Sequence, residues 1–295
     1  MKDSSNIDLS QRFIVLGSKG FLANQFVKRL EREKINYLAL GSAEVDLTQK
    51  ESIESLLKII RADDSVVMFS ALTPDRGKDL KSFYANMKMA EHLGMALEQS
   101  SVSHLTYISS DAVYSSKGEN ISEESPCDPS DLYGLMHLAR ERIFRFLMDQ
   151  IQRPLLILRP CAIYGIGDSH QSYGPNRFLK SALEQKKISL FGQGEEIRDH
   201  VAVEDVIEWV LEGTKQKMRG VVNLVSGQAV SFKEVAEMIV ENSSDQVEIK
   251  TSDRQNPIVH RRFISEKRAK LFPSHLPTEL KSGISRMFKI ATNSR

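Results

Sequence analysis

Two glycines near the start of the chain are spaced to form a phosphate-binding turn. Gly17 and Gly20, followed by Ala23, stand in the segment F-I-V-L-G-S-K-G-F-L-A at 13–23. The apolar residues before the first glycine predict a buried strand, and the apolar spacing after the second predicts a helix. A helix N-terminus offers unpaired N–H groups to a pyrophosphate. Gly17 permits a tight turn, Gly20 lets backbone approach phosphate, and a small residue at 23 lets helix lie on strand. The segment predicts a dinucleotide site.

Elements that could position this turn follow along the first half of the chain. We expect strands at 13–16, 37–40, 66–69, 105–109 and 155–159, with helices at 21–33, 49–61, 78–99 and 132–150. Such alternation predicts an α/β fold, a Rossmann-type doubly wound parallel sheet. Its ligands bind beyond the carboxyl ends of the strands.

After residue 160 the sequence changes character. A loop rich in Gly and Ser precedes a helix, and the chain after residue 231 carries two helical stretches separated by a basic, irregular segment. We expect a dinucleotide-binding domain over 12–160, with 200–225 returning to it. A smaller C-terminal substrate-binding cap would consist of 161–199 and 226–295.

Composition excludes several classes of partner. The chain has 295 residues and a formal net charge of +1, which gives no electrostatic basis for binding nucleic acid or a membrane surface. No apolar run approaches the ~20 residues that span a bilayer, and residues 1–11 lack the apolar centre of a signal peptide. Cys127 and Cys161 show no metal-ligand spacing and fit a reduced compartment. We expect a cytoplasmic protein without a metal.

Together with the glycine turn, further motifs are spread over nearly the whole length of the chain. They are Asp46-Leu47, Ser70-Ala71, Asn86, I-S-S-D-A-V-Y at 108–114, Tyr133-Gly134, L-R-P-C-A-I-Y-G at 158–165, G-P-N-R-F at 174–178 and R-D-H-V-A-V-E-D-V at 198–206. Together they resemble the extended short-chain dehydrogenase/reductases, specifically the nucleotide-sugar epimerase, dehydratase and reductase group. The resemblance implies an NAD(P) cofactor, a nucleotide-sugar substrate and a fold that allows a homodimer.

In that group a tyrosine exchanges a proton with the sugar hydroxyl while hydride passes to or from the nicotinamide, and a nearby Ser or Thr binds the same oxygen. The resemblance assigns these roles to Tyr133 and Ser110. A phenol with an ordinary pKa of ~10 needs its pKa lowered by roughly 3 units to act as a base near neutral pH. Family members supply this with a lysine four residues after the tyrosine, on the same helix face.

His137 occupies that lysine position here. A neutral imidazole can still hydrogen-bond the nicotinamide ribose, but with an ordinary pKa of ~6.5 it carries a full charge only in part at pH 7. Two hypotheses follow. One is an active enzyme whose Tyr133 keeps a pKa nearer its ordinary value, so that His137→Lys raises the rate at pH 7. The other is a dinucleotide-binding sensor or scaffold without chemistry.

The residues after Ser110 bear on the reaction. Dehydratases of the group place an Asp-Glu pair there, and this chain has Asp111 followed by Ala112. An alanine cannot act as a base, so dehydration is disfavoured. A 4-epimerase and a 4-keto reductase both remain, because each needs only the Ser, the Tyr and the nicotinamide.

The cofactor assignment comes from the same resemblance. Many NAD users carry a carboxylate at the end of the second strand, but here Leu40 is followed by Gly41 and Ser42, with no carboxylate before Glu44. Lys19 matches an arginine that contacts the 2′-phosphate in NADP-dependent relatives, which favours NADP. The full predicted cofactor set is Gly17, Lys19, Gly20, Phe21, Leu22, Ser42, Asp46, Leu47, Ser70, Ala71, Asn86, Tyr133, His137 and Pro160.

The predicted substrate set lies mostly in the second half of the chain. Relatives frame the nucleotide with the residues matching Asn176 and Arg177, and they bind the diphosphate with an arginine at the position of Arg198. A guanidinium suits this role because it makes bidentate contacts with phosphate oxygens. Asp111 and Arg261 complete the set. We expect an NAD(P)-dependent epimerase or ketoreductase acting on a nucleotide-linked sugar, in the synthesis of a surface polysaccharide or glycoconjugate.

Overall fold

The computed structural model describes residues 11–100, 102–116, 119–168, 174–255 and 257–293. The chain forms two compact units. The first consists of the residues up to Ser109 together with Asp131–Leu158 and Val210–Val221. The second consists of Ser110–Ser130, Arg159–Trp209 and the chain from Val222 onward. No helix among these described residues is long and apolar enough to cross a bilayer.

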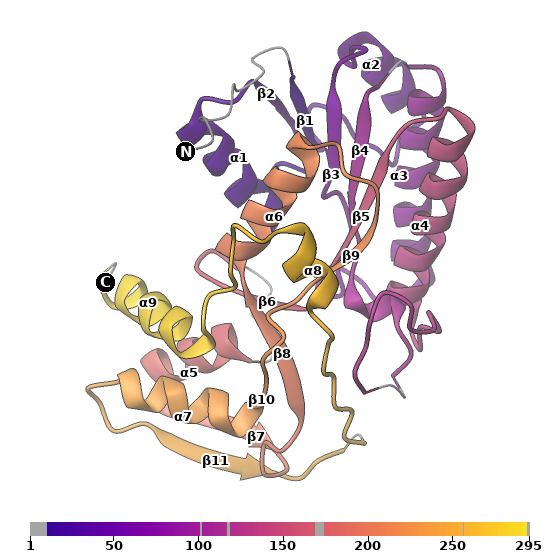
Figure 1. Ribbon diagram of the computed structural model, residues 1–295. Coiled ribbons are helices and arrows are strands. Elements are labelled where there is room, and N and C mark those ends of the chain that lie inside the picture. Colours follow the sequence, from indigo (N-terminus) through magenta and orange to yellow (C-terminus); the bar gives the residue numbers. More distant parts are fainter. Residues whose placement is uncertain (1–10, 101, 117–118, 169–173, 256, 294–295) are drawn as a thin grey trace. The chain divides into compact units, whose positions relative to one another are not determined.

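A six-stranded sheet in the order β2-β1-β3-β4-β5-β9 confirms the predicted α/β fold (Figure 1). Neighbouring strands from β2 to β5 run parallel. Because the strand order reverses between β1 and β3, their carboxyl ends lie side by side, where ligands bind in such sheets. The strands are β1 (Phe13–Leu16), β2 (Tyr37–Leu40), β3 (Ser65–Met68), β4 (His104–Ile108), β5 (Leu155–Pro160) and β9 (Gly220–Leu224).

Helices cover this sheet, and their bounds lie close to the predicted ones. They are α1 (Phe21–Glu33), α2 (Ser52–Ile59), α3 (Leu80–Glu98), α4 (Leu132–Gln150) and α6 (Val203–Lys215). Helices α2, α3 and α4 lie together on one side of the sheet (Figure 1). On α1, Phe26 is fully buried and packs against Phe13 and Phe69 at ring-centroid distances of 6.1 and 5.5 Å.

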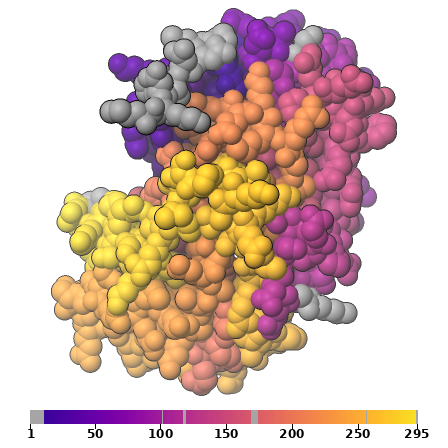
Figure 2. Space-filling model, viewed as in Figure 1, coloured from indigo at the N-terminus to yellow at the C-terminus, as the bar shows by residue number. Residues whose placement is uncertain are grey.

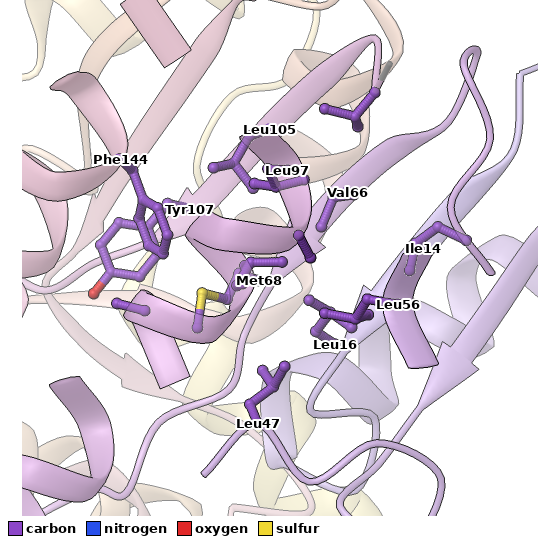
Figure 3. Close-up of a cluster of buried hydrophobic side chains, with 14 of the residues drawn as sticks. Ile14, Leu16, Leu47, Leu56, Val66, Met68, Leu97, Leu105, Tyr107 and Phe144 are labelled. Atoms are coloured by element: carbon purple, nitrogen blue, oxygen red, sulfur yellow. The ribbon is translucent and has the colours of Figure 1, made fainter. Parts of the chain in front are cut away.

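The core of the first unit lies between the sheet and helices α2, α3 and α4 (Figure 3). Val66, Leu105 and Tyr107 on the strands meet Leu97 on α3 and Phe144 on α4, all fully buried. Truncating such a leucine to alanine costs about 2–5 kcal/mol. This layer packs the C-terminal half of α4 against the sheet, and the first turn of the same helix carries the predicted catalytic tyrosine.

The second unit contains a three-stranded sheet in the order β10-β8-β6, and a two-stranded sheet of β11 and β7. Helices α5, α7 and α9 pack around its apolar core. The described C-terminal residues up to 293, yellow in Figure 2, lie at the surface. The elements are a short 3-10 helix η1 (Asp111–Val113), β6 (Ala162–Tyr164), α5 (Pro175–Gln185), β7 (Lys187–Phe191), β8 (Ile197–Ala202), β10 (Ala229–Ser231), α7 (Phe232–Asn242), β11 (Glu248–Ser252), α8 (Glu266–Leu271) and α9 (Leu280–Asn293).

The C-terminal part differs from the sequence prediction. After residue 231, where two helical stretches separated by an irregular segment were expected, the described residues form α7, α8 and α9 together with strand β11. The missed elements are short or exposed. Strand β11 has four exposed residues of five, so it shows no alternation of apolar and polar residues.

Candidate active site

The glycine turn joins β1 to α1, as the sequence predicts. Gly17 has φ +85°, and a Cβ on it would lie 2.9 Å from the backbone of Ser70, which follows β3. Only glycine fits there. Gly20 caps α1 without a side-chain hydrogen bond, and the first helical turn, which contains Phe21 and Leu22, has no acidic residue. The first N–H groups of α1 are therefore not capped by a side chain, which suits an anion.

Two side chains of opposite charge, those of Lys19 and Glu44, lie beside Gly41 at the end of β2. The backbone N–H of Gly41 donates to Glu44 Oε2 at 2.8 Å. A Cβ on Gly41 would lie 3.0 Å from that oxygen and 3.1 Å from Lys19 Cγ. Lys19 and the neighbouring Ser42 are exposed. Glu44 is absent from the predicted site, although an acidic residue about 20 positions after a glycine turn is the signal for ribose binding.

Among the other cofactor residues predicted in the first unit, Asn86 and Asp46 form hydrogen bonds with backbone groups. Asn86, buried on α3, accepts from the N–H of Leu72 at 2.8 Å and donates to its carbonyl at 3.0 Å. It thereby fixes the loop that begins at Ser70 and Ala71. Asp46 Oδ1 accepts from the N–H of Thr48 at 2.9 Å. Leu47 is buried, and its carbonyl oxygen lies 2.8 Å from Nδ1 of His92.

Tyr133 and His137 lie one turn apart near the start of α4. Asp131 begins the helix by accepting from the N–H of Gly134 at 2.8 Å. Residues four apart share a helix face, and the two rings meet edge to face with centroids 4.6 Å apart. Tyr133 is half-buried, whereas His137 is 2% exposed.

Tyr107 on β4 is the hydrogen-bond partner of the other imidazole nitrogen of His137. Its hydroxyl oxygen lies 2.7 Å from His137 Nδ1. Burial raises the pKa of the Tyr107 phenol, which is therefore neutral and serves Nδ1 as donor or acceptor according to the imidazole tautomer. Nε2 is buried without a hydrogen-bond partner among the described residues, and it carries the hydrogen in the tautomer whose Nδ1 accepts from Tyr107. Burial, assisted by the charge of Arg140, lowers the pKa of His137 well below its ordinary value, so the ring is neutral.

Ser110 and Asp111 belong to the second unit, while Tyr133 belongs to the first. Ser110 Oγ accepts from the N–H of Ala112 at 3.1 Å and begins η1. Arg261 donates to the Asp111 carbonyl at 2.8 Å and lies 3.5 Å from Oδ2 of its carboxylate. Burial raises the pKa of Asp111, although the charges of Arg261 and Arg198 act in the opposite direction.

Arg198 on β8 is already held by protein groups. It pairs with Glu196 and donates to the carbonyls of Ile197, at 3.0 Å, and Val259. The structure brings this guanidinium into the same charged cluster as Asp111 and Arg261, since both arginines act on the pKa of Asp111. Arg198, Asp111 and Arg261 lie far apart in the sequence, and the unit brings them together.

The remaining predicted residues of the second unit are Asn176, Arg177 and Pro160. Asn176 near the start of α5 accepts from the N–H of Gly165 at 3.0 Å and donates to its carbonyl at 2.7 Å. Arg177 is exposed, and Pro160 is buried at the end of β5. Asn176 therefore anchors the loop after β6.

The family follows from comparison with known proteins. Residues 13–225 match the sequence profile of the NAD dependent epimerase/dehydratase family. The chain belongs to this family, as its motifs indicated.

Individual relatives are similar to the chain in sequence, and solved structures share its fold. The human dTDP-D-glucose 4,6-dehydratase is 24% identical over 267 residues, which are 80% of this chain and 76% of that protein. The uncharacterized UDP-glucose epimerase YtcB of Bacillus subtilis (strain 168) is 24% identical over 171 residues, 57% of this chain and only 54% of that protein. The crystal structure of the Thermus thermophilus UDP-glucose 4-epimerase complex with NAD has a TM-score of 0.83 at 18% identity and covers 96% of this chain and 100% of that one.

Proposed function

We propose that the protein is an NAD(P)-dependent epimerase or ketoreductase that acts on a nucleotide-linked sugar at its 4-position. The observation that carries the proposal is the pair Tyr133 and His137 on one face of α4, with Nε2 of His137 buried and unpartnered among the described residues. A buried polar atom without a hydrogen-bond partner is costly, on the order of 1–3 kcal/mol. A ribose hydroxyl would satisfy it.

Residues of the first unit suit the cofactor. The uncapped N-terminus of α1 would hold the pyrophosphate, and the clash of any Cβ at Gly17 with Ser70 shows how close the backbone segments run. His137 would orient the ribose. A bound nicotinamide supplies the acceptance and return of hydride at the sugar carbon.

Tyr133 and Ser110 would then perform the proton chemistry, in the roles that the family resemblance gives them. As phenolate, Tyr133 takes the proton of the sugar hydroxyl while the hydrogen on carbon leaves with both electrons. Ser110 donates a hydrogen bond to the same oxygen. Reversal on the other face of the ketone gives the 4-epimer, and the reverse direction alone is 4-keto reduction.

Arg198, Arg261 and Asp111 would contact the nucleotide sugar. The relatives named above act on UDP- and dTDP-linked sugars by their names, and guanidinium groups bind diphosphates by charge-assisted hydrogen bonds. Ala112 supplies no base, so water elimination is disfavoured. Glu44 beside Lys19 opposes the preference for NADP that Lys19 favours, because a carboxylate binds the unphosphorylated ribose.

The test is to follow bound nicotinamide while UDP- and dTDP-sugars are added, and to analyse the sugar products. Transient reduction of the cofactor with a 4-epimer as product supports epimerisation. Net oxidation of NAD(P)H with a 4-keto sugar supports reduction. If the protein binds the cofactor but none of the 4-hydroxy or 4-keto sugars changes the redox state of that cofactor, the protein is the non-catalytic sensor or scaffold.

A further inference from the structure

Arg140 is the most unusual charged residue of the first unit. It lies on α4 and is 0% exposed, yet it forms no salt bridge with any described residue. Its guanidinium donates to the carbonyl of Ser70 at 2.8 Å, and its other near contacts are the sulfurs of Met68 at 3.2 Å and Met136 at 3.6 Å. Its Nε has no hydrogen-bond partner among the described residues. Burying a cation without a carboxylate is costly, which points to a use for the charge.

The geometry of α4 directs this charge toward Tyr133. Seven residues are close to two full turns of a helix, so Arg140 lies on the same face as Tyr133, with His137 between them. Long side chains on a helix lean toward its N-terminus, which is the end that carries Tyr133.

The side chains between them form a continuous chain. The guanidinium carbon of Arg140 lies 5.1 Å from the centre of the Tyr107 ring. The Tyr107 hydroxyl is hydrogen-bonded to Nδ1 of His137, and the His137 ring contacts the Tyr133 ring. Arg140, Tyr107 and His137 are all buried, so little solvent screens the charge.

We propose that Arg140 is a positioning residue for the proton chemistry, supplying from inside the fold the fixed positive charge that stabilises the phenolate of Tyr133, while His137 keeps only the neutral donor role. This rests on the proposed function of Tyr133. In the family that the chain resembles, one lysine supplies both a hydrogen bond and a positive charge. Here His137 would offer the hydrogen bond and Arg140 the charge.

The other charged or titratable groups on this face do not cancel the effect. Glu141 is the next residue on α4, about 100° around the helix, and it turns to accept from Ser109 Oγ at 2.5 Å. Arg140 lowers the pKa of Tyr107 more strongly than Glu141 raises it, although burial dominates. His137 is neutral. Interaction with Tyr133 also raises the pKa of Arg140, against the larger lowering by burial, which places the two groups in electrostatic contact.

The test measures the pKa of Tyr133 directly, by the ultraviolet absorbance of tyrosinate in each variant minus the same variant carrying Tyr133→Phe. This reading needs neither substrate nor turnover. Arg140→Met removes the charge and places an apolar side chain beside the sulfurs of Met68 and Met136. Arg140→Gln removes the charge but keeps a donor for the Ser70 carbonyl. Arg140→Lys is the matched control that keeps the charge.

We expect both neutral variants to raise the pKa of Tyr133 by about one unit or more, and Arg140→Lys to change it little. His137→Lys combined with Arg140→Met should return the pKa toward the wild-type value, because the cation is moved rather than lost. If the enzyme turns over, the neutral variants lose about tenfold in rate at pH 7 and recover it at higher pH.

A folded neutral variant, checked by circular dichroism and cofactor binding, that keeps the wild-type Tyr133 pKa overturns the proposal. So does a rate loss equal at every pH, which would mark a purely structural role. Absence of turnover in every variant, with the pKa shift present, would contradict the proposed function and leave the electrostatic role of Arg140 supported.

Discussion

The buried face of α4 in the first unit and the charged cluster of the second unit handle charge in opposite ways. On α4, Arg140 has no carboxylate partner and His137 keeps an unpartnered Nε2, among the residues that the structure describes. In the second unit, Arg198 pairs with Glu196 and Arg261 pairs with Asp111. The α4 face therefore has polar groups without a protein partner, whereas the arginines of the charged cluster are paired with carboxylates of the protein.

This difference separates two kinds of site residue. A group that lacks a protein partner is available to bind a ligand or to act on neighbouring groups through its charge. Its removal should therefore affect chemistry more than folding. A group already engaged must share or exchange its contacts with a ligand, so its removal should affect binding and local stability together.

The largest effect is expected for the group at the centre of the α4 face. Tyr133→Phe removes only the hydroxyl, which should lower kcat by about 10³-fold or more because proton transfer by a positioned side chain contributes roughly 10² to 10⁴. Cofactor affinity should stay within about twofold, since the ring contact with His137 is kept. Steady-state kinetics and a cofactor titration check this, and a variant that retains a tenth of the wild-type kcat would contradict the role.

An intermediate effect is expected in the paired region. Arg198→Ala should raise KM for the nucleotide sugar tenfold or more, because a charge-assisted contact contributes about 1.5–3 kcal/mol. It should also lower the unfolding midpoint, since two carbonyls and Glu196 lose a partner. Calorimetric titration with UDP and dTDP measures the binding, with Arg198→Lys as the charge-keeping control. Unchanged diphosphate affinity in Arg198→Ala would remove this residue from the site.

The two regions also differ in how far the sequence predicts them. The bounds of β1, β2, α1 and α4 match the prediction because their apolar periodicity and flanking glycines or caps are strong local signals. The sequence also shows that His137 stands where the family has a lysine. It could not show that Arg140 is buried, since an arginine in a helix is usually exposed. Nor could it show that Asn86 and Asn176 are engaged by backbone groups, which depends on contacts across loops.

A smaller effect concerns cofactor choice at the end of β2, where Lys19 and Glu44 lie beside Gly41. Lys19→Ala should weaken NADPH binding about tenfold and leave NADH nearly unchanged, because only the 2′-phosphate contacts the lysine charge. Glu44→Gln should act in the opposite direction and improve NADPH binding. Fluorescence titrations with both cofactors distinguish these outcomes, and equal losses for the two cofactors in Lys19→Ala would refute the 2′-phosphate assignment.

The smallest effect tests whether an unpartnered imidazole always signals a ligand. His200 in the second unit is fully buried beside Phe232, and neither of its ring nitrogens has a partner among the described residues. Burial lowers the pKa of His200 to about 3. Below its ordinary pKa of ~6.5 the unfolded chain binds a proton that the folded protein does not, so stability falls as pH falls, by about 1.4 kcal/mol per pH unit.

His200→Phe removes that linkage. Relative to wild type, the variant should therefore gain about 2 kcal/mol in the free energy of unfolding between pH 7 and pH 5, while nucleotide-sugar and cofactor affinities stay unchanged. Urea unfolding at the two pH values measures the first, and calorimetric titration the second. An unchanged pH dependence would mean that the imidazole is protonated equally in both states, whereas a loss of nucleotide-sugar affinity would place His200, like His137, among the groups held ready for a ligand.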